Sequence, residues 1–454
     1  MSAAQKSYWL KSGLFSILEK GSVFVFGFGG IALLARGLSL EAFGIWAVFN
    51  TVTAFFEVAR IGLQQNALVK FLSTHEGEDA ARIGTASLFN NILLTAFSVL
   101  LLFTGSFFIG QALNAPALGY LLRIYCVTTI LLIPFQQFNF TQQAKLDFSG
   151  IFWSNFASKG SFFAFILFLF LTKSEMTLEK LAYCQIYTAT VGSLISYLFA
   201  RKYLEFSARI DWNWVGRLFN FGRFVFGTNL STMLYKNIDK LMLSAMIGPE
   251  VVGVYDLAIK VTNLVEVPTF SIASVVYPQS ARQMLSEGKT AVKRLYEKSV
   301  AAILSLILPF LAFVFLAADY IILLMGTDKF TDSVGVLRIT ILFGLFIPFA
   351  IQFGTAMDSM GRPRMNFRLT LAMALLNAAL NYLFISQFGV IGAAYGTLLA
   401  WFIVFVMGQW ILYRTLDVRF YRVFGLIPQL IREGWSLLQR LVNKNETVSL
   451  KSEV

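Results

Sequence analysis

Long apolar runs dominate the pattern of hydrophobic and polar positions in this 454-residue chain. They recur from end to end with lengths of roughly 20 residues, which a helix needs to cross about 30 Å of hydrocarbon. Short segments rich in Gly, Pro, Asn or charged residues separate them. The pattern predicts an all-α polytopic membrane protein, because the strands of a transmembrane barrel would show short alternating segments instead.

We expect about twelve transmembrane helices, from the number of apolar runs of sufficient length. Their approximate limits are 13–35, 42–66, 86–109, 118–141, 150–171, 180–200, 222–246, 251–279, 300–324, 334–356, 365–386 and 389–413. The first run is too long for a signal-peptide core and has no small-residue cleavage site after it. It is therefore predicted to be the first span.

Lysine and arginine are distributed unevenly between alternate loops. One set of loops, with the two terminal segments, carries 25 of these residues, and the opposite loops carry 4. By the positive-inside rule, both termini are predicted to be cytoplasmic. This bias also accounts for much of the net charge of +12, so the charge does not indicate a nucleic-acid partner.

The composition agrees with a membrane protein and argues against a metal or cofactor. Charged residues make up 14% of the chain, against about 25% in soluble proteins. Both cysteines, Cys126 and Cys184, fall inside apolar runs, and the single histidine, His75, lies in a polar loop. We therefore predict no metal site and no cofactor.

An internal repeat is indicated at an offset of 209 residues. Segment 40–58 matches segment 249–267, and Glu41, Gly44, Val52, Thr53, Glu57 and Val58 meet Glu250, Gly253, Val261, Thr262, Glu266 and Val267. Both segments open the second span of a six-span half, so the halves have the same orientation, as in several transporter folds. The predicted organisation is an N-terminal lobe (1–204), an interfacial linker helix (205–220), a C-terminal lobe (221–414) and a cytoplasmic amphipathic tail (415–454).

Ionisable residues lie inside the predicted spans, where each is costly unless it faces a cavity or a partner. Eight are basic and five acidic: Glu19, Lys20, Glu57, Arg60, Arg123, Lys159, Lys236, Asp239, Lys240, Asp256, Lys260, Glu266 and Arg338. Arg123 and Arg338 lie near span ends and can extend to the membrane surface. The others follow steps of three and four in several helices, which indicates polar stripes around a shared cavity.

Two interpretations of these charges remain open. Glu57 with Arg60, Lys236 with Asp239, and Asp256 with Lys260 could form local pairs that hold helices together. The basic excess instead favours a cavity for an anionic ligand, with a phosphate held between Lys236 and Lys240. The candidate binding residues are Lys236, Lys240, Lys20, Arg60, Lys260 and Lys159, and the candidate coupling residues are Asp239, Glu57, Glu266 and Asp256.

Several segments together resemble the oligosaccharide flippases of the multidrug/oligosaccharidyl-lipid/polysaccharide exporter superfamily. They are LEAFGIWAVFNTV (40–52), NIDKLMLSAMIGPEVVGVYDLAIKV (237–261), VVYPQSAR (275–282), FGTAMDSMGRPR (353–364) and FGVIGAAYGTLLA (388–400). The family's Asp in the seventh span falls on Asp239, its Gly-x-Tyr motif on Gly253 and Tyr255, and its Gly-Arg-Pro loop on 361–363.

The resemblance implies two six-helix lobes around a central cationic cavity and transport by alternating access. The implied cargo is an undecaprenyl-diphosphate-linked oligosaccharide, moved to the outer leaflet of the bacterial cytoplasmic membrane. Besides this substrate, the expected partners are membrane lipids, with polysaccharide polymerase machinery as a candidate, and the expected state is a monomer. Asp239, Glu57 or Glu266 is a candidate for coupling to a proton or sodium gradient.

Three other functions are alternatives. A lipid II flippase of the same superfamily usually carries two further helices, and segment 418–442 is too charged to provide them. An exporter of cationic drugs would need an acidic excess in its cavity. An enzyme such as a polysaccharide polymerase would need a large outward loop, and SEGKT (286–290) is no phosphate-binding loop because Gln283 stands where glycine is required. We therefore predict a transporter and no enzyme.

Overall fold

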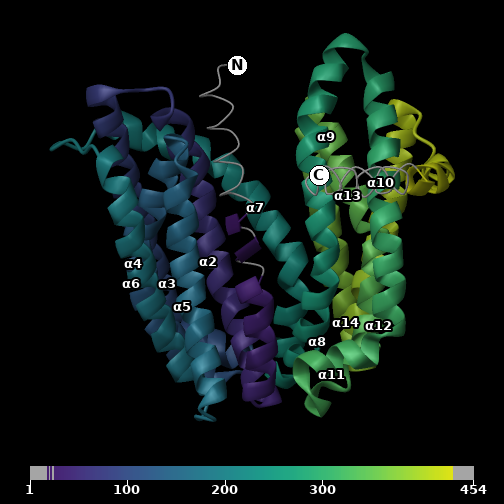
Figure 1. The fold of residues 1–454 in the computed structure, drawn as a ribbon, viewed down its shortest axis with the longest axis horizontal. Coiled ribbons are helices and arrows are strands. Elements are labelled where there is room, and N and C mark those ends of the chain that lie inside the picture. Colours follow the sequence, from purple (N-terminus) through teal and green to yellow (C-terminus); the bar gives the residue numbers. More distant parts are fainter. Residues whose placement is uncertain (1–17, 20, 23–24, 433–454) are drawn as a thin grey trace, which may run out of the picture. The chain divides into compact units, whose positions relative to one another are not determined.

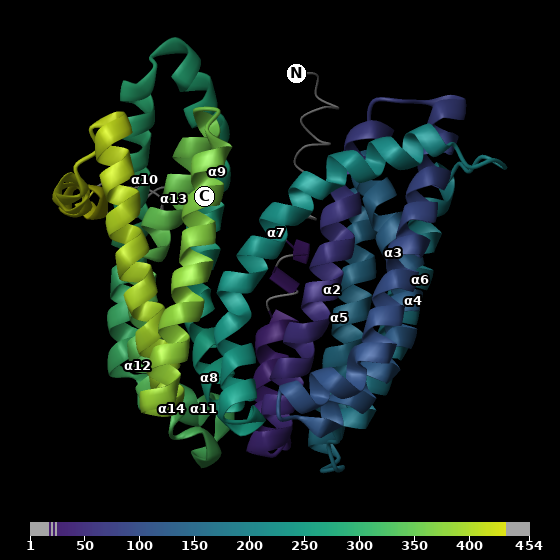
Figure 2. The ribbon, with the colours of Figure 1, turned by 180° about the vertical axis from the view of Figure 1, so that it is seen from behind.

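The computed structural model describes residues 18, 19, 21, 22 and 25–432. Every regular element within these ranges is a helix, and short turns connect the helices (Figure 1). The prediction of an all-α protein is therefore confirmed for this part of the chain. The long helices run side by side within each half of the chain, as Figure 2 shows from behind.

The long helices overlap the predicted spans, but the spans 251–279, 300–324 and 334–356 are each divided between two or more helices. The first half contains α2 (Leu40–Leu72), α3 (Gly77–Ala112), α4 (Pro116–Ala144), α5 (Phe148–Leu171), α6 (Leu178–Ala200) and the short η1 (Arg201–Tyr203). The second half contains α7 (Trp212–Met246), α8 (Pro249–Thr262), η2 (Asn263–Val265), α9 (Glu266–Ser286), α10 (Lys289–Leu316), α11 (Ala318–Gly326), η3 (Asp328–Phe330), α12 (Ser333–Thr340), η4 (Ile341–Leu345), α13 (Ile347–Ser359) and α14 (Pro363–Leu416).

Eight helical segments of the described chain are long and apolar enough to cross a membrane. One of them, α14, contains two predicted spans, because its backbone turns at Gly389, where φ is 61° and ψ is −137°. Only glycine adopts this conformation readily. Helices α6 and α7 are not among the eight, and Val25–Gly37 is a shorter apolar helix. The count of twelve therefore stays a prediction.

Helix α7 differs from the prediction at its start. Residues 212–220 do not form a separate linker helix but continue without a break to Met246. The Asp211 side chain accepts hydrogen bonds from the backbone N–H groups of Asn213 and Trp214, which fixes the first turn. Trp214 and Leu218 are buried in an apolar cluster with residues of α2, α3 and α4. Packing of these side chains makes the segment part of the long helix.

The helices group into two compact units. Unit 1 contains the described residues up to Leu257 and the segment Ile322–Asp332. In it, α2 packs along α7, and α4 packs along α3 and α6. Unit 2 contains Ala258–Ile321 and the described residues from Ser333 onward, with α9, α10, α13 and α14 side by side. The predicted lobes divide the chain at other positions and stay a prediction.

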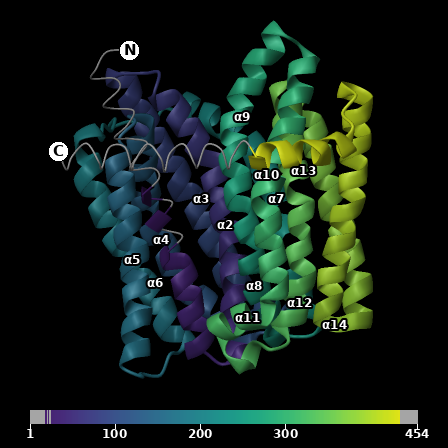
Figure 3. The ribbon, with the colours of Figure 1, turned by 45° about the vertical axis from the view of Figure 1, so that its right-hand side comes forward.

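The C-terminal tail begins with a helix at residues 420–432, which Figure 3 shows in yellow, running across the direction of α14. Val423 and Ile427 are buried. The Phe424 ring lies 6.5 Å from that of Phe349 in α13. Tyr421 and Ile431 are exposed. The described part of the tail therefore has buried and exposed side chains, while the amphipathic tail at the membrane surface stays a prediction and residues 433–454 lie outside the description.

The two glycines that the predicted repeat aligns pack against each other within unit 1. A Cβ atom on Gly44 would lie 1.7 Å from the carbonyl oxygen of Pro249 and 3.2 Å from the nitrogen of Gly253. A Cβ on Gly253 would lie 2.9 Å from the carbonyl oxygen of Leu40 and 3.2 Å from the nitrogen of Gly44. Leu40 and Pro249 are themselves related by the offset of 209. Helices α2 and α8 therefore approach each other closely at these two glycines, and the repeat itself stays a prediction.

Alanine at Gly44 is expected to destabilise the protein by at least about 2 kcal/mol, because the overlap is with backbone and the two helices must separate. In Gly253→Ala the added Cβ makes a milder contact, and the free energy of unfolding should fall by about 1 kcal/mol. Gly216 in α7 is the control, since a Cβ there has nothing within 4 Å, and Gly216→Ala should stabilise by about 0.5–1 kcal/mol. Thermal unfolding in detergent checks the order, and equal effects at Gly44 and Gly216 would contradict it.

The turn between α4 and α5 is tied to η1 through Asp147. Its carboxylate pairs with the Lys202 ammonium at 2.9 Å and accepts hydrogen bonds from Ser149 Oγ at 2.5 Å and Tyr203 Oη at 3.0 Å. Burial acts to raise the pKa of Asp147, but these three donors outweigh it and lower the pKa below its ordinary value.

Asp147→Asn is expected to lower the free energy of unfolding by about 1 kcal/mol at neutral pH. A carboxyl whose pKa is lowered by folding stabilises the protein above the ordinary range of aspartate, at about pH 4 and higher. This contribution is lost as the pH falls through the lowered pKa. Melting temperatures of parent and variant should therefore converge on acidification, and a constant gap at all pH values would count against the ion pair.

Candidate functional site

The predicted site residues are divided between the two units. Lys20 lies outside the described residues. Lys260, at the end of α8, and Glu266, at the start of α9, are half-buried and belong to unit 2. The remaining candidates belong to unit 1, where they form two buried polar clusters, with Lys236 half-buried and Lys159 exposed.

The first cluster joins α7 to α8. Asp239 and Lys240 in α7 face Tyr255 and Asp256 in α8, and all four side chains are buried. The Lys240 ammonium lies 2.5 Å from the Asp256 carboxylate. The Tyr255 hydroxyl donates to Asp239 Oδ2 at 2.5 Å, and Asp239 Oδ1 accepts from the backbone N–H of Lys240 at 2.9 Å. The cluster therefore places two carboxylates, one ammonium and one phenol in the protein interior.

The ion pair between Lys240 and Asp256 limits what Lys240 can bind. Asp256 pairs with Lys240 of α7, and its predicted pairing with Lys260 stays a prediction. The Lys240 ammonium is 6% exposed and neutralised by Asp256. Phosphate binding by Lys240 therefore requires this pair to open. Lys236, one turn earlier in α7, is half-buried, so its side chain reaches accessible space.

The second cluster joins α2, α3 and α4. Arg60 is 1% exposed and donates to Glu57 Oε1 at 2.9 Å. This is the local pair that the sequence allowed. The same guanidinium donates to Asn91 Oδ1 at 3.3 Å and to Gln136 Oε1 at 3.1 Å. Arg60 therefore joins three helices, and its position favours a structural role over direct contact with cargo.

Glu57 is the more accessible member of this cluster, with its side chain 17% exposed. Gln136 Nε2 donates to Glu57 Oε2 at 2.6 Å, and the Tyr125 hydroxyl donates to Oε1 at 3.3 Å. Lys159, in the middle of α5, is exposed. A lysine at mid-helix is costly against lipid, so we expect it to face a polar space.

Three residues of these networks were not predicted. Asn91, Tyr125 and Gln136 lie in α3 and α4, and the sequence interpretation followed polar stripes only in the spans that correspond to α2, α7 and α8–α9. A signal was nevertheless present for Asn91 and Gln136, because amides are uncommon in apolar spans and need a partner there. Across the described residues, no group of three or more His, Cys, Asp or Glu side chains is arranged to hold a metal ion. The absence of a metal stays a prediction.

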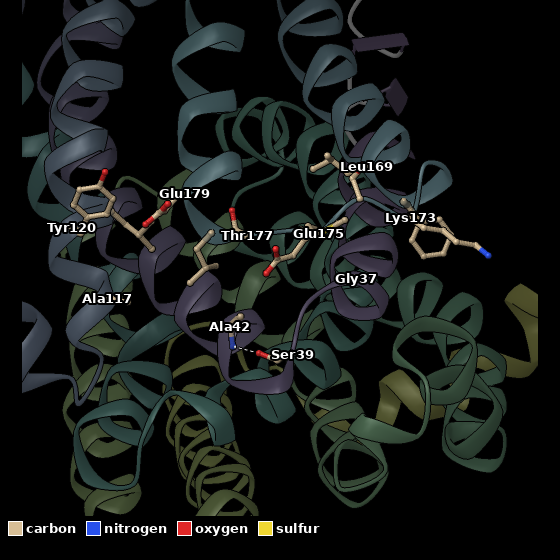
Figure 4. Close-up of a pocket in the computed structure, with 15 residues that line it drawn as sticks. Gly37, Ser39, Ala42, Ala117, Tyr120, Leu169, Lys173, Glu175, Thr177 and Glu179 are labelled. Atoms are coloured by element: carbon tan, nitrogen blue, oxygen red, sulfur yellow. Dashed lines mark hydrogen bonds between the residues drawn. The ribbon is translucent and has the colours of Figure 1, made fainter.

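A separate pocket of about 1110 Å³ opens at the end of unit 1 where α2 and α4 begin and the α5–α6 connection lies. Leu121, Leu169 and Met176 form apolar parts of its wall. The polar side chains around it come from Ser39, Lys173, Ser174, Thr177, Tyr120, Glu175 and Glu179. Figure 4 shows Glu179 beside Tyr120, Glu175 nearer the middle of the group, and the Lys173 ammonium pointing away from both carboxylates.

Long apolar helices with ion pairs buried between them describe a multi-pass membrane protein. The profile of a family described as "polysaccharide biosynthesis protein" matches residues 33–335, well over half of the chain. The chain belongs to this family, within the multidrug/oligosaccharidyl-lipid/polysaccharide exporter superfamily.

Two relatives illustrate the range of similarity. The chain is 21% identical to the probable low-salt glycan biosynthesis flippase Agl15 of Haloferax volcanii, over 50% of this chain and 46% of the relative. It is 20% identical to a putative O-antigen transporter of Shigella flexneri, over 86% and 94% of the two chains. The match spans about half or less of the length of the first curated relatives.

Solved structures show the same fold. An inward-facing multidrug resistance MATE family transporter superposes with a TM-score of 0.76 at 15% identity, covering 92% of this chain and 99% of the other. The lipid II flippase MurJ, in an inward closed conformation, superposes with a TM-score of 0.72 at 15% identity, covering 94% and 92%. At this identity the likeness establishes the fold alone.

Proposed function

We propose that this chain moves a lipid-linked oligosaccharide from the inner to the outer leaflet of a bacterial cytoplasmic membrane. The observation that carries the proposal is the set of cationic side chains inside unit 1. Lys236 is half-buried and Lys159 is exposed, both within long helices, where a transporter of apolar molecules would need no ammonium group. A diphosphate between lipid and sugars is an anion that such groups would bind.

The transport cycle we propose is alternating access. In an inward-open state, Lys236 receives the diphosphate while the lipid tail stays in the bilayer. Lys240 joins it if its pair with Asp256 opens, and Lys20, Lys159 and Lys260 are the other candidate ligands. Closure of the cytoplasmic side then exposes the headgroup outward. Protonation of Glu57, Asp239 or Glu266 is a candidate coupling step, because it would remove the negative charge that neutralises the neighbouring cations.

Complementation tests this function. The parent gene is placed in a bacterial strain that lacks its own flippase, and surface polysaccharide is measured. We expect the parent to restore it, and to give no efflux of cationic dyes from vesicles. Dye efflux without any polysaccharide would instead favour the drug-exporter alternative. Restoration of cell-wall synthesis in a strain lacking its lipid II flippase would favour the second alternative.

A further inference from the structure

The pocket at the end of unit 1 has the composition of a ligand site. Binding pockets are concave, mostly apolar and carry a few convergent polar groups. Here the apolar wall is interrupted by the hydroxyls of Ser39 and Thr177 and by the carboxylates of Glu175 and Glu179. All lining residues belong to unit 1, so the shape of the pocket depends on one compact unit. Its volume of about 1110 Å³ accommodates more than one sugar ring.

The charges of the pocket define what it can bind. Among the ion pairs of the described residues, none involves Glu175 or Glu179. The Lys180 ammonium donates to the backbone carbonyl of Glu175 at 2.7 Å instead of to its carboxylate. With Lys173 pointing away (Figure 4), the pocket presents hydrogen-bond acceptors and negative charge. It would repel a phosphate and accept hydroxyl donors.

One tyrosine, Tyr120, lies at the edge of this pocket, and others are exposed near it in the sequence of α6. Tyr120 of α4 lines it and is 48% exposed, and its hydroxyl lies 3.2 Å from that of Tyr183 in α6. Tyr183 and Tyr187 are also exposed. Exposed tyrosines combine an apolar ring face with a polar tip, which suits the apolar faces and hydroxyl edges of a sugar ring. They also occur at membrane surfaces generally, so the combination with the carboxylates is what distinguishes this edge.

We propose that this pocket holds uncharged, hydroxyl-rich sugars of the cargo headgroup at the outward end of unit 1. The inference rests on the proposed function and on the predicted orientation, which places the α5–α6 connection outside the cytoplasm. Glu175 and Glu179 accept hydrogen bonds from sugar hydroxyls, and Tyr120 contacts a ring face. The diphosphate stays outside the pocket because of the two carboxylates. The site therefore retains the headgroup after it crosses the membrane and before it is released.

Cysteine protection tests the occupancy of the pocket in cells. Ala117 lines the pocket and is exposed, so Ala117→Cys places a thiol there, and Lys173→Cys provides the control at its rim. Labelling by a membrane-impermeant maleimide is compared between cells that make the lipid-linked oligosaccharide and cells that lack the first sugar-transfer step. We expect Ala117→Cys to react at least threefold more slowly in the producing cells, and Lys173→Cys to react equally in both. Cys126 and Cys184 are buried, and the parent measures their background.

Adding Glu175→Gln and Glu179→Gln to Ala117→Cys should abolish the protection. Equal labelling of Ala117→Cys in both cell types would overturn the proposal, and so would protection that survives the two glutamines. If neither cysteine reacts with the maleimide added from outside, the predicted orientation is wrong and the proposal is overturned with it. Surface polysaccharide made with the parent is scored separately, so a pocket that stays empty during successful transport is distinguished from a failure of the proposed function.

Discussion

Lys240→Ala is expected to lower the free energy of unfolding by about 3–5 kcal/mol, because it leaves the Asp256 carboxylate buried without its counter-charge. Lys240 and Asp256 are 6% and 4% exposed, so water cannot replace the lost partner. Thermal unfolding of the purified protein measures the loss. Asp256→Asn in the same chain removes the uncompensated charge, and the double variant should recover much of the stability. A double variant no more stable than Lys240→Ala would contradict this explanation.

Lys236→Ala is the matched control for Lys240→Ala, because Lys236 lies one turn before Lys240 in α7. Lys236 is half-buried, so its removal should change the unfolding free energy by about 1 kcal/mol or less. If it contacts the diphosphate, surface polysaccharide in the complemented strain should fall at least about tenfold, the loss of one charge-assisted interaction of about 1.5–3 kcal/mol. Full transport by a well-expressed Lys236→Ala would mean that the cargo is held elsewhere, with Lys159 and Lys260 as the next candidates.

Arg60→Leu is the second variant with a large expected effect. It should lower the free energy of unfolding by about 3–5 kcal/mol. It removes the guanidinium that donates to Glu57, Asn91 and Gln136, and so leaves acceptors of three helices without their donor. The protein should unfold at a lower temperature and accumulate less in the membrane. Arg60→Lys keeps the charge but not the forked geometry, and it should recover only part of the loss.

Arg82→Leu is the control for Arg60→Leu. Arg82 pairs with Glu78 at 2.7 Å, but the two side chains are 41% and 80% exposed. An exposed pair of this kind contributes about 0–1 kcal/mol. Equal destabilisation by the two leucine variants would show that the buried network does not hold α2, α3 and α4 together.

The sequence predicted the helices well because each span carries its own signal. Apolar runs of sufficient length and turn residues such as Gly389 specify a helix and its end locally. The start of α7 was missed for the opposite reason. Trp212 and Trp214 suggested a membrane surface, but Trp214 is buried against α2 and α3, and such packing between distant segments cannot be read from the segment itself.

The residues of the candidate site could likewise be predicted only in part. Intramembrane charges were identifiable one by one, since each needs a cavity or a partner. Which alternative applies depends on helix packing: Lys240 meets Asp256 only because α7 packs beside α8, and Arg60 meets Gln136 through α4. The contact between Gly44 and Gly253 is an exception, because the repeat in the sequence already related these two positions.

Translocation by the purified protein tests the central claim most directly. The full chain is reconstituted into vesicles that contain an undecaprenyl-diphosphate-linked oligosaccharide in both leaflets. The fraction open to an external glycosidase is followed with time. We predict that the pool protected inside the vesicles becomes accessible with the parent and at least about tenfold more slowly with Lys236→Ala. A protected pool that stays constant with well-folded parent protein would contradict the assignment of this chain as a flippase for lipid-linked oligosaccharides.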